Sequence, residues 1–176
     1  MRSADTPFTG ASSDLDAELR RVEDILSGMP PVRAMALRVV GMDNGCLRLS
    51  APLSVNVNDK GCAFGGSLSG LMTLACWSLC AVQLALRGQR PEIYVQDSSV
   101  RYLAPLYDDL LAEASATDDT DWDALAESLV NRGRARARLQ AVIRLPDGRP
   151  AATLEGRFVA IASDPGASER KPTESD

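Results

Sequence analysis

The sequence predicts an α+β fold in which an antiparallel sheet curls around one long central helix. Residues 66–87 are apolar almost throughout, which is typical of a helix buried on all sides. The segments before and after this stretch show the alternation of apolar and polar residues that marks strands, with turn signals between them. A regular series of alternating strands and helices is missing, which argues against a doubly wound nucleotide-binding sheet. A single very apolar helix needs a sheet to cover it, and antiparallel hairpins can supply that sheet.

The chain is predicted to begin with a leader and a helix. Residues 1–12 are rich in Ser, Thr and Pro, and we expect a flexible leader there. Ser13 is placed to cap a helix that starts near Asp14, and Gly28 with the two prolines that follow ends it. Five apolar residues recur at helical spacing within it: Leu15, Leu19, Val22, Ile25 and Leu26.

A hairpin and the long helix are expected next. From Met35 the apolar period falls to two, and the Asp-Asn-Gly turn at 43–45 predicts a return strand that runs to Ala51. The long helix 66–87 then follows a glycine-rich loop, and Gly88 and a nearby proline stop it.

The last part of the chain is predicted to supply four more strands. An acidic segment, 118–132, is expected to form a short helix or a loop between two of them. A single domain therefore spans residues 13–162, and the polar residues 163–176 are predicted to be a disordered tail. The four strands are expected at 93–103, 110–116, 134–145 and 151–161.

Composition excludes several classes of function. The chain has 176 residues, of which 45% are hydrophobic, enough for one domain with a proper core. Its net charge of −5 offers no global basic field for nucleic acid or an anionic membrane. There is no histidine, which removes Ser-His-Asp and Cys-His catalysis, the usual histidine base and most zinc sites. We expect no metal and no other cofactor.

The cysteines and the N-terminus predict a cytoplasmic protein. The first ten residues lack the basic and apolar regions of a signal peptide. The apolar run 68–86 approaches membrane-spanning length, but four polar residues interrupt it and a buried core helix is favoured. The four cysteines form no C-x-x-C pair and lie on apolar stretches, which favours buried free thiols: Cys46, Cys62, Cys76 and Cys80.

The glycine-rich loop 58–70, NDKGCAFGGSLSG, is the main candidate for a binding site. A glycine loop that leads into a helix can hold an anionic group at the helix N-terminus. Gly61 and Gly66 have the spacing of a phosphate-binding loop, but Ser67 stands where the lysine is required, so a nucleoside triphosphate is excluded. The alternative without a ligand is that the glycines only permit a tight turn into a buried helix, with Asn58 and Asp59 as turn residues.

The wider pattern resembles the hotdog-fold thioesterases. Residues 58–66 match N-x-x-G-x-x-F-G-G, and a later strand ends in VRYLAP at 100–105. In the phenylacetyl-CoA thioesterase type, a histidine precedes the paired glycines. The chain resembles more closely the hotdog domain of the bacterial YiiD-type proteins, in which phenylalanine stands there. The resemblance covers about residues 20–162. It implies a homodimer whose two sheets join side by side, with an acyl thioester held at the subunit interface.

The resemblance also implies roles for loop residues. The backbone N–H groups of Gly65 and Gly66 would polarise the thioester carbonyl, and Asn58 would position the attacking water or the carbonyl. The physics agrees, because a backbone oxyanion hole needs residues without a β-carbon and the helix dipole favours developing negative charge. Three further loop residues are candidate substrate contacts, the first through a phosphate: Lys60, Phe64 and Ser67.

The sequence departs from the family where the catalytic carboxylate is expected. That position is Thr73, whose hydroxyl can orient a water but cannot act as a general base near pH 7. Asp59 is an alternative base or nucleophile, or else only a turn residue. Asp97 lies in a strand that is polar on both faces, which either lines a cavity or forms an exposed edge. Its neighbours Ser98 and Ser99 are candidate substrate contacts with it.

The sequence offers two other groups of residues for consideration, four arginines and two large apolar residues. Arg132, Arg134, Arg136 and Arg138 alternate with small residues and are expected on one side of a strand. They could meet CoA phosphates or an acidic carrier protein, or they form a solvated sheet face. The large apolar residues of the long helix, Met72 and Trp77, are expected in the core.

These observations predict a hydrolase of acyl-CoA or acyl-carrier-protein thioesters that uses a helix N-terminal oxyanion hole and an activated water. The alternative is a non-catalytic module that binds or senses acyl thioesters in the same cleft. The hydratase branch of the fold relies on a catalytic histidine, and the sequence has none. Association of the dimer into a tetramer remains open.

Overall fold

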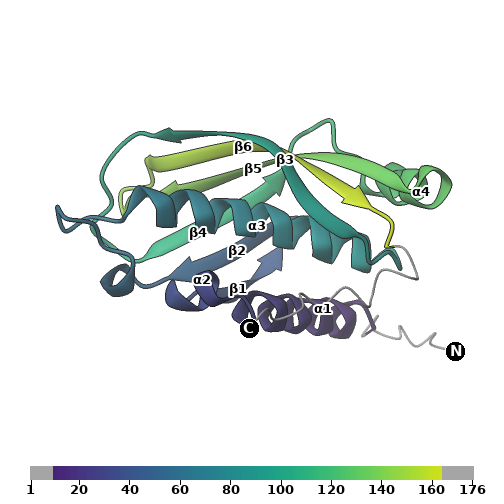
Figure 1. Ribbon diagram of the computed structural model, residues 1–176, viewed down its shortest axis with the longest axis horizontal. Coiled ribbons are helices and arrows are strands. Elements are labelled where there is room, and N and C mark those ends of the chain that lie inside the picture. Colours follow the sequence, from purple (N-terminus) through teal and green to yellow (C-terminus); the bar gives the residue numbers. More distant parts are fainter. Residues whose placement is uncertain (1–9, 164–176) are drawn as a thin grey trace, which may run out of the picture.

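The computed structural model of the protein describes residues 10–163 (Figure 1). One six-stranded antiparallel sheet carries the long helix α3 lengthwise on one face, with α1 along the edge of the sheet near β1. This confirms the predicted α+β architecture. In chain order the elements are α1 (Gly10–Ser27), α2 (Pro30–Ala34), β1 (Arg38–Asp43), β2 (Cys46–Ala51), the 3₁₀ turn η1 (Leu53–Val55), α3 (Gly65–Ala85), β3 (Glu92–Tyr102), β4 (Leu110–Ala116), α4 (Trp122–Arg132), β5 (Arg134–Arg144) and β6 (Pro150–Ile161).

The helix α3 is the centre of the core, as predicted. Met72 is fully buried, and Trp77 is partly buried and donates its indole N–H to the carbonyl of Ile93 on β3 at 3.1 Å. By length and composition α3 could also cross a membrane, with a mean hydropathy of 1.6. However, 61% of that apolar window is buried inside the protein, which a core helix explains.

The strand β5 shows how the sheet receives α3. Its alternate residues are buried against the helix, and most of these are small, so the helix can pack close to the sheet. The intervening residues, mostly arginines, point to the opposite, convex face. The buried set is Ala135, Ala137, Leu139, Ala141 and Ile143.

The sheet order, β1-β2-β4-β5-β6-β3, leaves β3 at an edge. Within residues 10–163, β3 pairs only with β6, so its other side carries unpaired backbone groups. The pairing shifts between Val95 and Asp97, where β3 has a bulge. Gly156 on β6 lies beside this bulge, where it is paired with Ser98.

Some predicted boundaries were wrong at the N-terminal end. The helix α1 begins at Gly10, so Ser13 lies inside it and does not cap it. The prolines after Gly28 begin the short helix α2, because proline suits the first turn of a helix, where its missing N–H costs no hydrogen bond. The strand β1 begins at Arg38 and not at Met35. The predictions for residues 1–9 and 164–176 lie outside the described residues.

The acidic segment after β4 forms a helix. Asp121 caps α4 by accepting hydrogen bonds from the backbone N–H groups of Asp123 and Ala124. The helix runs to Arg132 and ends at Gly133, which has a φ of 66°. Arg132 therefore belongs to the helix, and the prediction that it lies on a strand with the other arginines was wrong.

Candidate active site at the N-terminus of α3

A short hairpin, residues 57–63, leads the chain into α3. Val57 and Ala63 form a β-bridge, and the N–H of Asn58 donates to the carbonyl of Cys62 at 2.8 Å. Gly61 turns the chain with a φ of 79°, a conformation that glycine adopts readily. The glycine-rich loop thus forms a defined hairpin that fixes where the helix begins.

The first turn of α3 presents three backbone donors. Phe64 is the N-cap residue and its side chain makes no capping hydrogen bond. The first helical bond is the one from the N–H of Leu68 to the carbonyl of Phe64, at 3.0 Å. Within residues 10–163, the N–H groups of Gly65, Gly66 and Ser67 have no backbone or side-chain acceptor. Unpaired donors at the positive end of a helix suit a carbonyl oxygen that gains negative charge.

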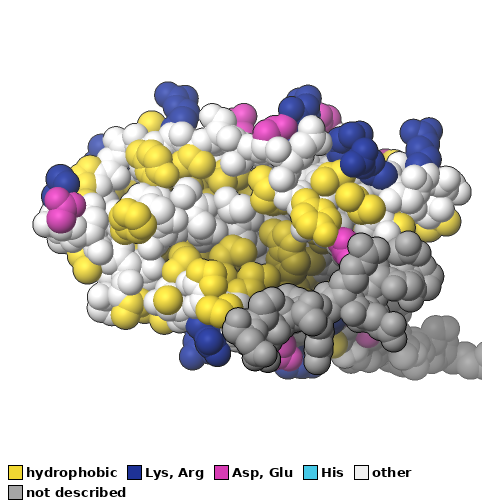
Figure 2. Space-filling model, in the orientation of Figure 1, with side chains coloured by type: hydrophobic (Ala, Val, Ile, Leu, Met, Phe, Trp, Pro, Cys, Tyr) yellow, Lys and Arg dark blue, Asp and Glu magenta, His cyan; other side chains and the backbone are white. Residues whose placement is uncertain are grey.

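Two aromatic rings flank the paired glycines. A β-carbon at Gly66 would lie 2.3 Å from Cε1 of Phe64, so this ring lies against the backbone of Gly66. A β-carbon at Gly65 would lie 3.5 Å from Cε1 of Tyr102, and the Tyr102 hydroxyl donates to the carbonyl of Gly65 at 3.1 Å. Both rings are about half exposed, at 55% for Phe64 and 56% for Tyr102. Figure 2 shows apolar side chains gathered over this face of the protein, with charged side chains mostly at its rim.

The side chain of Asn58 makes its hydrogen bonds within the hairpin. Its Oδ1 accepts from the backbone N–H groups of Lys60 at 2.8 Å and Cys62 at 3.3 Å. Its Nδ2 donates to the Sγ of Cys62 at 3.2 Å. These contacts agree with the turn role considered from the sequence, and a role for Asn58 toward a substrate stays a prediction.

Asp59 and Lys60 form the tip of the hairpin. The Nζ of Lys60 contacts both carboxylate oxygens of Asp59 at 2.8–2.9 Å, and both side chains are largely exposed. The pair is free to reorganise, because exposed ion pairs contribute little to stability.

Two hydroxyl groups on α3 lie near the glycines along the chain. Ser67 is only 8% exposed, while Thr73 is partly buried two turns farther along the helix, on the side that Gly66 occupies. In the described part of the chain, neither hydroxyl makes a hydrogen bond. Both remain available to a bound molecule.

The structure separates the three candidate residues on β3. Ser98 lies opposite Gly156 and shares a face with Val100, which packs on the core, so it faces the α3 side. Asp97 and Ser99 point to the convex face. There the carboxylate of Asp97 accepts from the Nε of Arg157 at 2.8 and 3.0 Å, and this hydrogen bond lowers the pKa of Asp97. Asp97 and Ser99 are therefore not brought together with Gly65 and Gly66 within one protomer.

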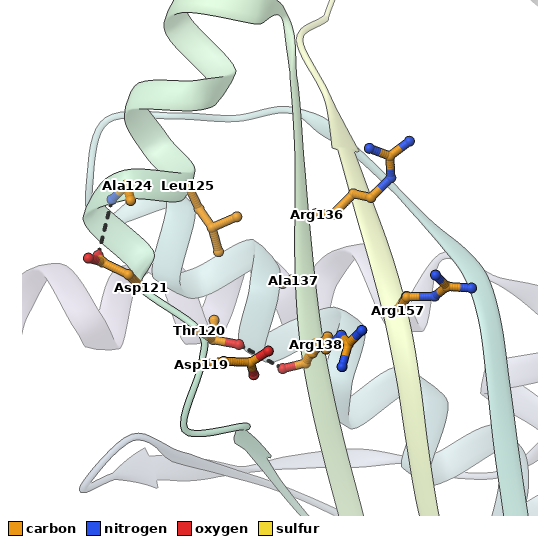
Figure 3. Close-up of a pocket in the computed structure, with 9 residues that line it drawn as sticks. All are labelled: Asp119, Thr120, Asp121, Ala124, Leu125, Arg136, Ala137, Arg138 and Arg157. Carbon is orange, nitrogen blue, oxygen red and sulfur yellow. Dashed lines mark hydrogen bonds between the residues drawn. The ribbon is translucent and has the colours of Figure 1, made fainter.

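The convex face contains a separate cavity of about 390 Å³ between α4 and the strands β5 and β6 (Figure 3). Arg136, Arg138 and Arg157 line it on the strand side. Asp119 and Asp121 line it from the segment before α4, so the cavity mixes both signs of charge. Arg136 is held by the side chain of Gln96, through its Nε at 3.1 Å. A solvated sheet face and a phosphate contact both remain compatible with this arrangement.

Two residues of the site were not predicted from the sequence. Tyr102 lies in the strand-end motif VRYLAP, but its contact with Gly65 depends on how β3 crosses the end of α3. Asn56 is 2% exposed, and its Nδ2 donates to the carbonyls of Met35 and Pro52 at 2.9 and 2.8 Å. Its own carbonyl accepts from the N–H of Phe64 at 2.7 Å, so Asn56 ties the N-cap of α3 to the fold. A lone polar residue between Val55 and Val57 was the only available signal.

Residues 10–163 contain no cluster of three or more cysteine, aspartate or glutamate side chains able to hold a metal ion. All four cysteines are free thiols, and three of them are buried.

The chain is similar to known proteins in sequence and in structure. The sequence profile of the family described as "Putative thioesterase (yiiD_Cterm)" matches residues 19–162. The structure is similar to that of a protein of unknown function from Chlorobaculum tepidum, with 26% identity and a TM-score of 0.79 over 88% of this chain and 100% of that one. It is also similar to a "putative thioesterase" from Shewanella oneidensis, with 28% identity and a TM-score of 0.74 over 83% and 99% of the two chains.

A more distant similarity confirms the fold alone. A thioesterase from Haemophilus influenzae shares 12% identity and a TM-score of 0.64, over 82% of this chain and 90% of that one. No curated protein matches the sequence. The helix wrapped by one antiparallel sheet is thus the hotdog fold that the sequence predicted.

Proposed function

The chain belongs to the YiiD C-terminal thioesterase family, and from this premise we propose that it hydrolyses the thioester bond of an acyl-CoA or an acyl-carrier protein. The observation that carries the proposal is the first turn of α3, where Gly65 and Gly66 have no β-carbon and their N–H groups have no acceptor among the described residues. A thioester carbonyl can approach such a backbone closely, and its oxygen would accept from both groups.

The proposed reaction is the attack of water on the carbonyl carbon. The carbonyl oxygen becomes an oxyanion in the tetrahedral intermediate, and the helix N-terminus stabilises the new charge. The carbon–sulfur bond then breaks, which releases the carboxylic acid and the thiol of the carrier. The water must lose a proton during the attack, so a base is required.

We assign the base to Asp59 and the orientation of the water to the hydroxyl of Thr73. Asp59 is seven residues before Gly66, and its exposed ion pair with Lys60 can open at little cost. The freed Lys60 would then meet a phosphate of the carrier. Ser67, Phe64 and Ser98 are proposed to line the substrate cleft on the α3 side.

A homodimer is part of the proposal. The edge of β3 offers unpaired backbone groups that a second β3 can pair with, which would join two sheets side by side. The partly exposed side of α3 and the apolar residues around its N-terminus would then be covered by the partner. Asp97 and Ser99 point to the convex face, and joining two sheets side by side along β3 would leave them on that face.

The alternative function is a module that binds or senses acyl thioesters without hydrolysing them. The missing carboxylate at Thr73 is the observation that favours it. Both functions use the same backbone donors, so they differ only in turnover.

One experiment separates the two. The purified protein is incubated with acyl-CoAs and acyl-carrier proteins of graded chain length, thiol release is followed, and the molar mass is measured by light scattering. Turnover that falls in Gly66→Val supports the hydrolase. Saturable binding without turnover on any substrate supports the module, and neither binding nor turnover would refute both.

A further inference from the structure

Tyr102 joins the end of the edge strand β3 to the first turn of α3. Its hydroxyl donates a hydrogen bond of 3.1 Å to the carbonyl oxygen of Gly65, the first residue of the helix. Its ring also packs against Gly65, since a β-carbon there would lie 3.5 Å from Cε1 and 3.7 Å from Cζ. The side chain is 56% exposed, so burial in the core does not account for its position.

The bonded carbonyl belongs to a peptide unit that matters for the proposed reaction. The carbonyl of Gly65 and the N–H of Gly66 lie in one planar unit and point in opposite directions. A group that holds the carbonyl therefore also sets the direction of the N–H. A hydrogen bond to the carbonyl oxygen further polarises the unit, which makes the N–H a stronger donor.

This end of α3 needs such support. Glycine has more backbone freedom than any other residue, and two glycines begin the helix. The N-cap residue, Phe64, has no side-chain oxygen to hold the first turn in place. The Tyr102 hydroxyl is the only side-chain donor that contacts the backbone of Gly65 or Gly66 from another element in residues 10–163.

We propose that Tyr102 is a positioning residue for the oxyanion hole: its hydrogen bond to the carbonyl of Gly65 orients and polarises the N–H of Gly66. Tyr102 acts through the backbone and does not itself take part in the chemistry. The inference rests on the proposed function, because it takes the N–H of Gly66 to be a group that binds the thioester carbonyl.

The test is Tyr102→Phe, which removes the hydroxyl and keeps the ring. We expect kcat to fall about tenfold, the scale of one lost hydrogen bond made in the transition state, while KM changes less than about twofold. Tyr107→Phe is the matched control, since Tyr107 is 66% exposed and its hydroxyl makes no hydrogen bond within the described residues. A purely structural role would lower the stability of Tyr102→Phe and leave kcat per folded molecule unchanged.

A second measurement does not require turnover. Two CoA analogues are compared by calorimetry: a ketone with one methylene between sulfur and carbonyl, and a thioether of equal length without the carbonyl. The wild type should bind the ketone more tightly, and Tyr102→Phe should lose most of this preference while it binds the thioether equally well.

The outcomes distinguish this inference from the proposed function. Absence of turnover in the wild type, with a carbonyl preference that depends on Tyr102, refutes the hydrolase and supports the positioning role. Turnover and carbonyl preference that are both unaffected in Tyr102→Phe overturn the positioning role and leave the hydrolase standing. A wild type without turnover and without carbonyl preference overturns both.

Discussion

The ring of Phe64 occupies the space that a side chain at Gly66 would need, since a β-carbon there would lie 2.3 Å from Cε1 and 2.8 Å from Cζ of the ring. The ring therefore lies beside a backbone donor of the proposed oxyanion hole. Because Phe64 is 55% exposed, it can turn without breaking the core. It would then form one wall of the path by which an acyl group reaches the helix.

The first prediction concerns Gly66→Ala. The new methyl group must displace the Phe64 ring, and the displaced ring and the methyl together crowd the N–H of residue 66. We expect kcat/KM to fall about 100-fold, comparable to the loss of one oxyanion-hole donor. Steady-state thiol release measures the effect.

The double variant Gly66→Ala with Phe64→Ala separates the two causes. Recovery of most of the activity would assign the loss to the ring, and no recovery would assign it to the methyl group. Gly70→Ala on the same helix serves as the control, because Gly70 lies outside the proposed oxyanion hole and a β-carbon there meets only the Met35 side chain, at 3.8 Å. Equal activity in Gly66→Ala and the wild type would remove residue 66 from the mechanism.

The second prediction concerns the hairpin. Asn58→Ala leaves the N–H groups of Lys60 and Cys62 without their acceptor, so we expect the free energy of unfolding to fall by about 1–2 kcal/mol. Urea denaturation measures the change. Activity should also fall, because the hairpin then no longer fixes where α3 begins. Asn58→Asp keeps the acceptor oxygen and should restore the free energy of unfolding.

If Asn58→Asp restores stability but not activity, the amide itself contacts the substrate. If Asn58→Ala is as stable as the wild type, the hairpin contacts are not what Asn58 supplies.

The third prediction tests the base. Asp59→Asn should lower kcat by about 100-fold or more, the usual contribution of a general base. Lys60→Met is the matched control: it breaks the same ion pair but leaves the carboxylate, and it should mainly raise KM for CoA substrates. Full activity in Asp59→Asn at every pH tested would exclude Asp59, and the base would then have to come from elsewhere.

The sequence predicted the architecture better than its details. The apolar run identified α3 within two residues at each end, because a helix buried on nearly all sides leaves an unbroken apolar pattern. The short helix α2 was missed because its proline pair resembles a stop signal when no structure is known. The position of β3 beside β6 depends on contacts between distant segments, which local periodicity does not report.

Local patterns in the sequence likewise identified only part of the candidate site, because its other contacts join distant segments. Paired glycines before an apolar helix are visible in a motif, so Gly65 and Gly66 could be found. The contact of Tyr102 with Gly65 joins residues 37 positions apart and required the fold. The side of the sheet that Asp97 faces depends on the register of β3, which the bulge after Val95 shifts by one residue.

The fourth prediction concerns the buried thiols. Burial raises the pKa of Cys80 to about 12, and the pKa of Cys76 is raised by the same cause. At pH 8 only about one Cys80 side chain in 10,000 is then a thiolate, the form that reacts. We expect the native protein to expose no thiol to a disulfide reagent at Cys76 or Cys80, and the urea-unfolded protein to react at all four cysteines.

The same shift predicts how stability depends on pH. The thiols are neutral in the folded protein, whereas unfolded thiols ionise near pH 8.5, about the value for a free cysteine. The stability they contribute is complete below that pH and is lost as the pH rises toward 12. Replacing both cysteines with alanine should reduce this loss of stability at alkaline pH. Rapid labelling of either cysteine in the native protein would contradict the conclusion that both thiols are buried and neutral.

The last prediction connects the edge strand to the fold through Gly156. A β-carbon there would lie 3.1 Å from the backbone oxygen of Asp97 and 3.3 Å from the β-carbon of Ser98, both on β3, and 3.2 Å from the Phe158 ring. Gly156→Ala must therefore push β3 away from β6, and we expect a loss of about 1–3 kcal/mol in the free energy of unfolding. Gly70→Ala is the control, since its β-carbon meets only Met35 at 3.8 Å and alanine favours a helix, so this variant should be neutral or slightly more stable. If β3 also forms the proposed dimer edge, Gly156→Ala should weaken the dimer in sedimentation experiments, whereas unchanged association with reduced stability would place the dimer contact elsewhere.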